Sequence, residues 1–266
     1  MDFVNNMQIK RGIYILPSIF TVANIGAGFM SLHYSINNNF SYAAWAIIIA
    51  IIMDITDGRI ARAMHAESSF GVELDSLADF FSFGIAPSVL MYQMHLKGLG
   101  KIGLGIAIFF VIASALRLAR FNSASHQNNE IKPHFEGLPT TAAGGIIASF
   151  VLSYELFEIG PELTAKTIPL IMKKMPLFFQ IMPFLMVLIS ILLISKIKYS
   201  NFKKINFSRP HSFQFFVLLV VSLILIFTYP QNTIFIIYIL YFLSGIIGYF
   251  LRLFHLRKRE DNCTDK

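Results

Sequence analysis

Long apolar stretches separated by short polar segments dominate this sequence. A helix needs about 20 predominantly apolar residues to cross a bilayer. Only 14% of the residues are charged, against about a quarter in soluble domains. The pattern predicts an all-α polytopic membrane protein with eight helices, at 14–35, 41–65, 70–96, 102–122, 138–157, 176–196, 213–229 and 232–254.

Positive charge is concentrated in a few of the connecting segments. The net charge is +7, and Lys and Arg gather before the first span, between the sixth and seventh, and after the last. Such clusters mark the cytoplasmic side of a membrane. We therefore expect a multi-pass protein of the cell inner membrane with both termini in the cytoplasm, and no nucleic acid as partner. The segment 158–175 falls on the outer side yet carries three lysines, which favours an interfacial amphipathic piece.

The chain is predicted to divide into a six-helix core and two additional C-terminal helices. A break at 197–212 predicts a catalytic core of six helices over residues 1–200 and two additional helices over 201–256, followed by a frayed polar cytoplasmic tail at 257–266. The last two helices have almost no polar residues in their interiors. We expect their role to be structural.

Four aspartates stand inside the second and third predicted helices. Asp54 and Asp57 are three residues apart, and Asp75 and Asp79 four apart, so each pair shares one helix face. Two adjacent antiparallel helices joined by a short turn can point all four carboxylates at one volume.

Four carboxylates in one volume repel each other and are costly to bury. The nearby Arg59 and Arg62 bring too little positive charge to balance them, whereas divalent cations would. An all-oxygen site favours Mg²⁺, Mn²⁺ or Ca²⁺ over zinc, and two ions would suit four carboxylates and a phosphate substrate. Gly58 and Gly71 would let such a substrate approach the backbone, and Arg62 could pair with a phosphate oxygen.

Two other interpretations compete with a metal site. A single aspartate near a helix end is usually a cap or a solvated charge, but four in 26 positions argue against this. Intramembrane carboxylates also mark cation or proton pathways. Against a transporter, the acids cluster at the cytoplasmic end of two helices and no polar relay continues outward.

The residues from 54 to 79 form the pattern D-x2-D-G-x2-A-R-x8-G-x3-D-x3-D. This pattern resembles the signature of the CDP-alcohol phosphatidyltransferases, with every position filled. The resemblance implies a core of six transmembrane helices, a homodimer, and a site at the cytoplasmic membrane surface where an alcohol displaces CMP from a CDP-linked lipid. It also implies that Asp54, Asp57 and Asp75 are metal ligands, and that Asp79 is both a ligand and the catalytic base.

The same resemblance assigns residues to the cytidine diphosphate. They are Asp57, Gly58, Ala61, Arg62, Gly71 and Asp75. In the first helix, LPSIFTVANIGAG is similar to the family's P-N-x-x-T-x-x-N element. Thr21 and Asn24 keep its last two polar positions, while Ser18 replaces the first asparagine.

Three further segments bear on the acceptor alcohol. FFSFGIAPS, ASALRLARFN and FEGLPTTAAGG resemble bacterial type II phosphatidylserine synthases, which implies CDP-diacylglycerol and L-serine as substrates, in contact with membrane lipid. Arg117 and Arg120 could clamp the serine carboxylate or hold the lipid phosphate, or they could be ordinary snorkelling residues. Ser82, Glu136 or a metal-bound aspartate could receive the ammonium group. Glycerol 3-phosphate, inositol phosphate and amino alcohols stay open as acceptors.

Overall fold

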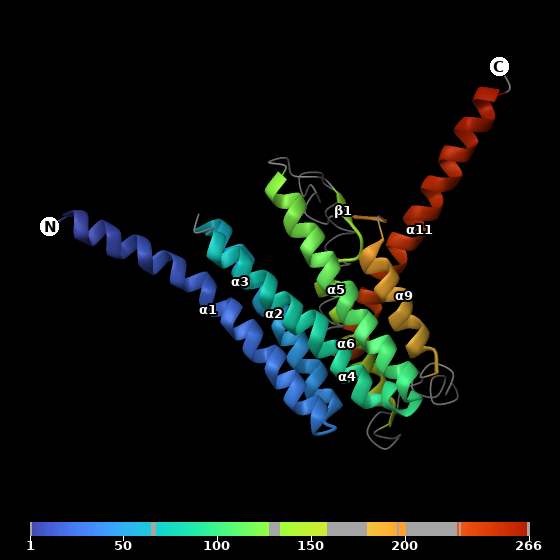
Figure 1. Ribbon diagram of the computed structural model, residues 1–266, viewed down its shortest axis with the longest axis horizontal. Coiled ribbons are helices and arrows are strands. Elements are labelled where there is room, and N and C mark those ends of the chain that lie inside the picture. The colour runs from blue at the N-terminus through green and yellow to red at the C-terminus, as the bar shows by residue number, and fades with distance from the viewer. Residues whose placement is uncertain are drawn as a thin grey trace.

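The computed structural model describes residues 2–64, 68–127, 134–158, 180–195, 197–200, 228 and 230–264. Its helices lie side by side in one bundle (Figure 1). They are α1 (Asp2–Ile36), α2 (Phe40–Ala63), α3 (Ser69–Asp79), the π-helical η1 (Phe80–Ile85), α4 (Ala86–Met94), the short 3₁₀ helix η2 (Leu96–Leu99), α5 (Lys101–Gln127), α6 (Thr140–Glu158), α9 (Met182–Ile194) and α11 (Pro230–Thr264). The predicted helix 213–229 and the segment 158–175 lie outside the described residues except at 158 and 228.

The helices of the bundle have the length and the apolar surface that a membrane requires. Four helical stretches are long and apolar enough to cross one, and two shorter apolar helices accompany them. Large apolar side chains point outward, among them Phe70 and Phe184, which are 72% and 77% exposed. Contiguous apolar surface of this kind suits lipid rather than water. The prediction of a polytopic helical membrane protein is confirmed. The spans are Phe40–Ala63, Ser69–Met94, Lys101–Ser123 and Pro230–Tyr249, with Thr140–Tyr154 and Met182–Ile194 as the shorter helices.

Two short strands interrupt the helical pattern. β1 (His134–Glu136) pairs antiparallel with β2 (Lys198–Ser200), with Phe135 opposite Tyr199. This pairing joins the segment before α6 to the segment after α9, so it ties two distant connections together on one side of the bundle.

Small residues let the helices approach closely. α1 packs along α2, α2 against α6, and α6 against α11. Gly28 of α1 lies against Ser82, whose hydroxyl donates a 3.0 Å hydrogen bond to the Asn24 carbonyl. A side chain at position 28 would collide with that hydroxyl. Close contact of this type is how helices associate when lipid removes the hydrophobic driving force.

The third predicted helix, 70–96, is continuous but not regular. α3, η1 and α4 follow one another without a break from Ser69 to Met94, and the middle segment is π-helical. Within it the Ala86 N–H donates to the Phe81 carbonyl, five residues back. Pro87 follows at once, and in a regular α-helix its ring would clash with the carbonyl four residues earlier. The wider turn relieves that clash, and it begins directly after Asp79.

Both terminal helices extend beyond their apolar stretches. α1 begins at Asp2, and α11 continues to Thr264. The prediction of a frayed tail is therefore wrong for residues 257–264. Their sequence RKREDNCT has neither Gly nor Pro and begins with good helix formers, so the helix continues where the apolar pattern stops. Both chain ends lie toward the upper side of the bundle in Figure 1.

Candidate active site

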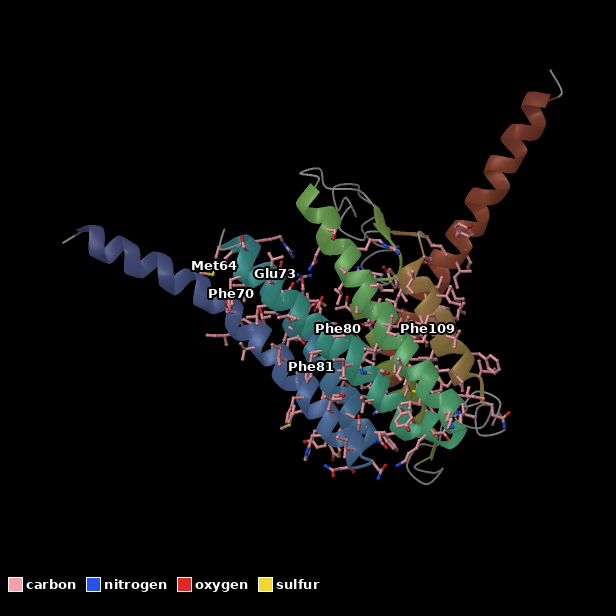
Figure 2. All side chains as sticks on the ribbon, viewed as in Figure 1. Met64, Phe70, Glu73, Phe80, Phe81 and Phe109 are labelled. Atoms are coloured by element: carbon pink, nitrogen blue, oxygen red, sulfur yellow. The ribbon has the colours of Figure 1, made fainter. Side chains whose placement is uncertain are left out.

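The four predicted aspartates come from two neighbouring helical runs. Figure 2 shows Met64 and Phe70 at one end of α2 and α3, and Phe80 and Phe81 farther along the second run. Because the aspartates of α3 fall between Phe70 and Phe80 in the sequence, the acidic site lies between these two levels. One carboxylate oxygen from each of three residues lies within 4.8 Å of the others; these residues are Asp54, Asp57 and Asp75.

Asp79 lies beside this group of three. Its acidic neighbours are Asp54 and then Asp75, and its basic neighbour is Arg117. The Oδ1 atoms of Asp75 and Asp79 are buried, and they accept no hydrogen bond from the residues that the structure describes. Asp79 is thus the aspartate on which the charge of Arg117, in α5, acts.

The donor set fits a hard divalent cation. Two carboxylates this close repel each other by about 3 kcal/mol at an effective dielectric constant of about 20. Three such pairs cost roughly 10 kcal/mol, which is comparable to the whole stability of a typical domain. The ligand atoms are all oxygens, and two buried oxygens have no hydrogen-bond partner in the described part of the chain. A bound cation would offset the repulsion between the carboxylates and would coordinate the oxygens that have no hydrogen-bond partner.

Helix α1 contributes two polar residues that the sequence singled out. Thr21 donates a buried 2.9 Å hydrogen bond from Oγ1 to Oδ2 of Asp57, which fixes the orientation of that carboxylate. Asn24, one turn later, is fully buried, and neither atom of its side-chain amide is paired within the described residues. A buried amide without a partner is costly, so Asn24 suits a polar ligand. Ser18 is half-buried on the preceding turn of α1.

Gly58 and Arg62 lie next to each other, one turn apart on α2. A Cβ atom at Gly58 would lie 3.5 Å from Nη1 of Arg62, so the guanidinium extends back over the glycine. Its positive charge acts on Asp54 and on Asp57. Ala61, half-buried, belongs to the same stretch of helix. Gly58, Ala61 and Arg62, which were predicted to bind the nucleotide, therefore come directly after Asp54 and Asp57 in α2.

Gly71 lies in the first turn of α3. Its N–H donates a 3.0 Å hydrogen bond to the hydroxyl of Ser68, the N-cap of this helix. A Cβ at this position would lie 3.1 Å from the same hydroxyl. Gly71 thus has a structural reason to be small, in addition to its predicted place in the nucleotide pocket.

The two arginines of α5, Arg117 and Arg120, lie in different environments. Arg117 is 9% exposed and donates a 3.1 Å hydrogen bond from Nη1 to the hydroxyl of Thr140. Its guanidinium lies 5.2 Å from the centre of the Phe121 ring. Arg120 is exposed and donates a 2.6 Å hydrogen bond to the carbonyl of Ile194, in the last turn of α9. Arg120 caps a helix end, whereas Arg117 is buried and its charge acts on Asp79.

The predicted ammonium acceptors Ser82 and Glu136 belong to different elements, η1 and β1. Ser82 is fully buried, and its hydroxyl proton is used in the bond to the Asn24 carbonyl that joins η1 to α1. Glu136 is in β1, opposite Lys198 of β2 in the strand register.

Two tyrosines of α11 interact electrostatically with residues of this region, and the sequence prediction did not include them. Tyr238 lies against Gly145 of α6, and the charge that acts on its hydroxyl is that of Asp54. Tyr241 and Arg117 act on each other electrostatically. The available signal was their spacing, because two tyrosines three residues apart in an apolar helix present polar groups on one face.

Comparison with known proteins gives a consistent picture. The family model for the CDP-alcohol phosphatidyltransferases matches residues 14–196. A CDP-diacylglycerol–serine O-phosphatidyltransferase of Helicobacter pylori is 34% identical over 238 residues, which covers 88% of this chain and 91% of the relative. The protein of that name from Bacillus subtilis is 35% identical over 147 residues, covering 54% of this chain and 81% of the relative. An archaetidylserine synthase of Methanothermobacter thermautotrophicus is 30% identical over 198 residues, 74% of this chain and 73% of the relative.

Proposed function

The chain belongs to the CDP-alcohol phosphatidyltransferase family, and we propose that it transfers the phosphatidyl group of CDP-diacylglycerol to the hydroxyl of L-serine. The products are phosphatidylserine and CMP. The observation that carries the proposal is the meeting of three carboxylate oxygens within 4.8 Å of one another, near a buried arginine, Arg117, whose charge acts on Asp79. An acid can take a proton from the acceptor there, while the arginine holds the carboxylate of the same acceptor.

The acidic group would hold the diphosphate through metal. Asp54, Asp57, Asp75 and Asp79 would bind divalent cations, Mg²⁺ or Mn²⁺ and two per site, which neutralise the charge of the diphosphate and of the departing CMP. Thr21 orients the Asp57 carboxylate through its 2.9 Å hydrogen bond. Arg62, which extends over Gly58, is placed to pair with a phosphate oxygen. Asn24 offers an amide to the nucleotide.

The chemical step needs one proton acceptor. Asp79 takes the proton of the serine hydroxyl as the serine oxygen bonds to the phosphorus of the phosphatidyl group. The bond from that phosphorus to the oxygen of CMP breaks, and CMP departs with the bonding pair. A general base in contact with its proton donor contributes roughly 10²–10⁴-fold to rate. Arg117 stabilises the carboxylate of serine and positions its hydroxyl.

Assembly and location follow from the family resemblance and the charge pattern. We infer a homodimer in the inner membrane, with the acidic site and both termini on the cytoplasmic side. Static light scattering of the purified protein tests the first inference, since a monomer mass would overturn it.

The acceptor is tested by a panel of alcohols. Purified full-length protein in vesicles containing CDP-diacylglycerol is assayed for CMP release with Mg²⁺ or Mn²⁺. L-serine, glycerol 3-phosphate, inositol phosphate, ethanolamine and choline are each offered alone. We expect release only with serine, and none after chelation with EDTA. Release with another alcohol but not with serine assigns a sibling activity, and the movement of a cation across the vesicle without any CMP release assigns a transporter.

A further inference from the structure

Two contacts fix the register of α5 against the run of α3 and η1. The side-chain amide of Asn122 donates a 2.9 Å hydrogen bond to the hydroxyl of Ser76. Farther along, a Cβ atom at Gly84 would lie 3.1 Å from the Cβ atom of Ser114. Gly84 comes eight residues after Ser76, and Ser114 comes eight residues before Asn122. Both contacts therefore give the same antiparallel register for these neighbouring helices (Figure 1).

This register brings Arg117 to the level of Asp79. Asp79 is three residues past Ser76, so it lies across from position 119, two residues from Arg117. Two residues of helix span about 3 Å along the axis, which an arginine side chain can bridge. Asp79 shares a helix face with Ser76, and Arg117 shares one with Ser114, because residues three apart are neighbours on a helix surface. The register thus agrees with the action of the two charges on each other.

The guanidinium of Arg117 is held on two sides. Its Nη1 donates a 3.1 Å hydrogen bond to Oγ1 of Thr140, which is fully buried. Its Cζ lies 5.2 Å from the centre of the Phe121 ring. A guanidinium carries five N–H donors, and Thr140 is the residue of the described chain to which this one donates. The other donors are therefore open to a ligand.

Thr140 has a fixed place at the start of α6. Two residues before it, the Leu138 N–H donates a 3.1 Å hydrogen bond to the carbonyl of Leu192 in α9. One turn after it, a Cβ atom at Gly144 would lie 3.2 Å from Cα of Phe83 in η1. The hydroxyl is therefore presented to the arginine by backbone that is packed between α9 and η1.

We propose that Thr140 is a positioning residue, whose hydroxyl holds the guanidinium of Arg117 near Asp79 in the orientation that receives the carboxylate of the acceptor. This inference rests on the proposed function, because it takes an amino acid as acceptor. A planar guanidinium binds a carboxylate through two parallel hydrogen bonds, so its orientation matters as well as its charge. Without the anchor, the long side chain would occupy several rotamers, and ordering it again on binding would weaken the affinity.

The test compares variants of the full-length protein in CDP-diacylglycerol vesicles. Thr140→Val and Thr140→Ala remove the hydroxyl, the first with the shape of the side chain kept, and Thr140→Ser restores the hydroxyl. Ser149→Ala is the control on α6, since Ser149 is also fully buried but donates to the carbonyl of Ile146 in its own helix. For each variant, KM for serine, KM for CDP-diacylglycerol, kcat and the midpoint of thermal unfolding are measured.

We expect Thr140→Val and Thr140→Ala to raise KM for serine about tenfold, as loss of one hydrogen bond to a charged group does. KM for CDP-diacylglycerol stays constant, Thr140→Ser restores the low KM for serine, and Ser149→Ala changes neither KM. The inference is overturned if loss of the hydroxyl leaves KM for serine unchanged, whatever happens to thermal stability. It is also overturned if Thr140→Ser has the same high KM as Thr140→Val, or if KM for CDP-diacylglycerol rises instead, which would assign the arginine to the lipid phosphate.

Failure of the proposed function gives a different result. If the unmodified protein releases no CMP with serine, the serine assignment fails before any variant is compared. The variants are then measured with the acceptor that does release CMP. A higher KM for that acceptor in Thr140→Val, restored in Thr140→Ser, keeps Thr140 as a positioning residue, and an unchanged KM removes that role as well.

Discussion

Asp79 differs from the other three aspartates in its neighbours. Asp54, Asp57 and Asp75 bring their oxygens within 4.8 Å of one another, while Asp79 adjoins this group and is the aspartate on which the charge of Arg117 acts. A carboxylate in that position can bind metal and can also meet the acceptor. The spacing of the sequence predicted that the acids would meet, because helical periodicity determines which side chains share a face. It did not predict which of them would face Arg117, because that depends on how α5 packs.

Asp79→Asn tests this difference. We expect CMP release to fall by about 10²–10⁴-fold, since the amide cannot accept the hydroxyl proton, while CDP-diacylglycerol still binds through the remaining aspartates. Turnover and nucleotide binding by calorimetry are measured on the same preparation. Glu73→Gln is the matched control, an exposed acid on the same helix. Full turnover by Asp79→Asn would exclude its role as base.

Thr21→Val tests the hydrogen bond that orients Asp57. Loss of a partner that orients a ligand typically weakens metal affinity about 10- to 100-fold. We expect the Mn²⁺ concentration for half-maximal CMP release to rise by that factor, and Mn²⁺ binding followed by electron paramagnetic resonance to weaken in parallel. Thr56→Val removes a hydroxyl from α2 that bonds the Ile52 carbonyl within the helix, and its metal dependence should not change.

At the level of elements, helix type was easier to predict than helix detail. Apolar length identified the spans at 41–65, 70–96 and 102–122, because the bilayer sets the length of a crossing helix. The π-helical turn after Asp79 was missed, although Pro87 was the signal for it. π turns of this kind often occur at functional sites. The contact of Tyr238 in α11 with Gly145 in α6 was also missed, because only the packing of the two helices brings these residues together.

Gly145→Ala tests the contact between α6 and α11. The added methyl group would overlap the Tyr238 ring, and overpacking of this kind costs about 1–3 kcal/mol. We expect a lower midpoint of thermal unfolding. Gly248→Ala is the control on α11, where a Cβ meets nothing within 4 Å. There a helical alanine should be neutral or stabilise by up to about 1 kcal/mol.

At the level of the whole molecule, the charge pattern and the fold are consistent with the same orientation in the membrane. Basic residues gather near both ends of the chain, and both ends lie toward the upper side of the bundle in Figure 1. Under the positive-inside rule, this is the side proposed to face the cytoplasm, where serine and CMP are soluble. The orientation is therefore part of the proposed function.

Cys263 provides a label for this orientation, because it is the only cysteine of the chain and lies near its C-terminus. We expect a membrane-impermeant maleimide to modify inverted inner-membrane vesicles and to leave intact spheroplasts unmodified. Cys263→Ser should remove the label in both preparations. Labelling of intact spheroplasts would place the C-terminus outside and reverse the assigned topology.

The gap at Gly145 has an evolutionary consequence. The ring of Tyr238 occupies the volume that a side chain at position 145 would need, so the two positions cannot change independently. In related sequences that retain this helix, a residue larger than glycine at 145 should occur only where 238 has become smaller than tyrosine. Substitutions at these two positions should therefore covary.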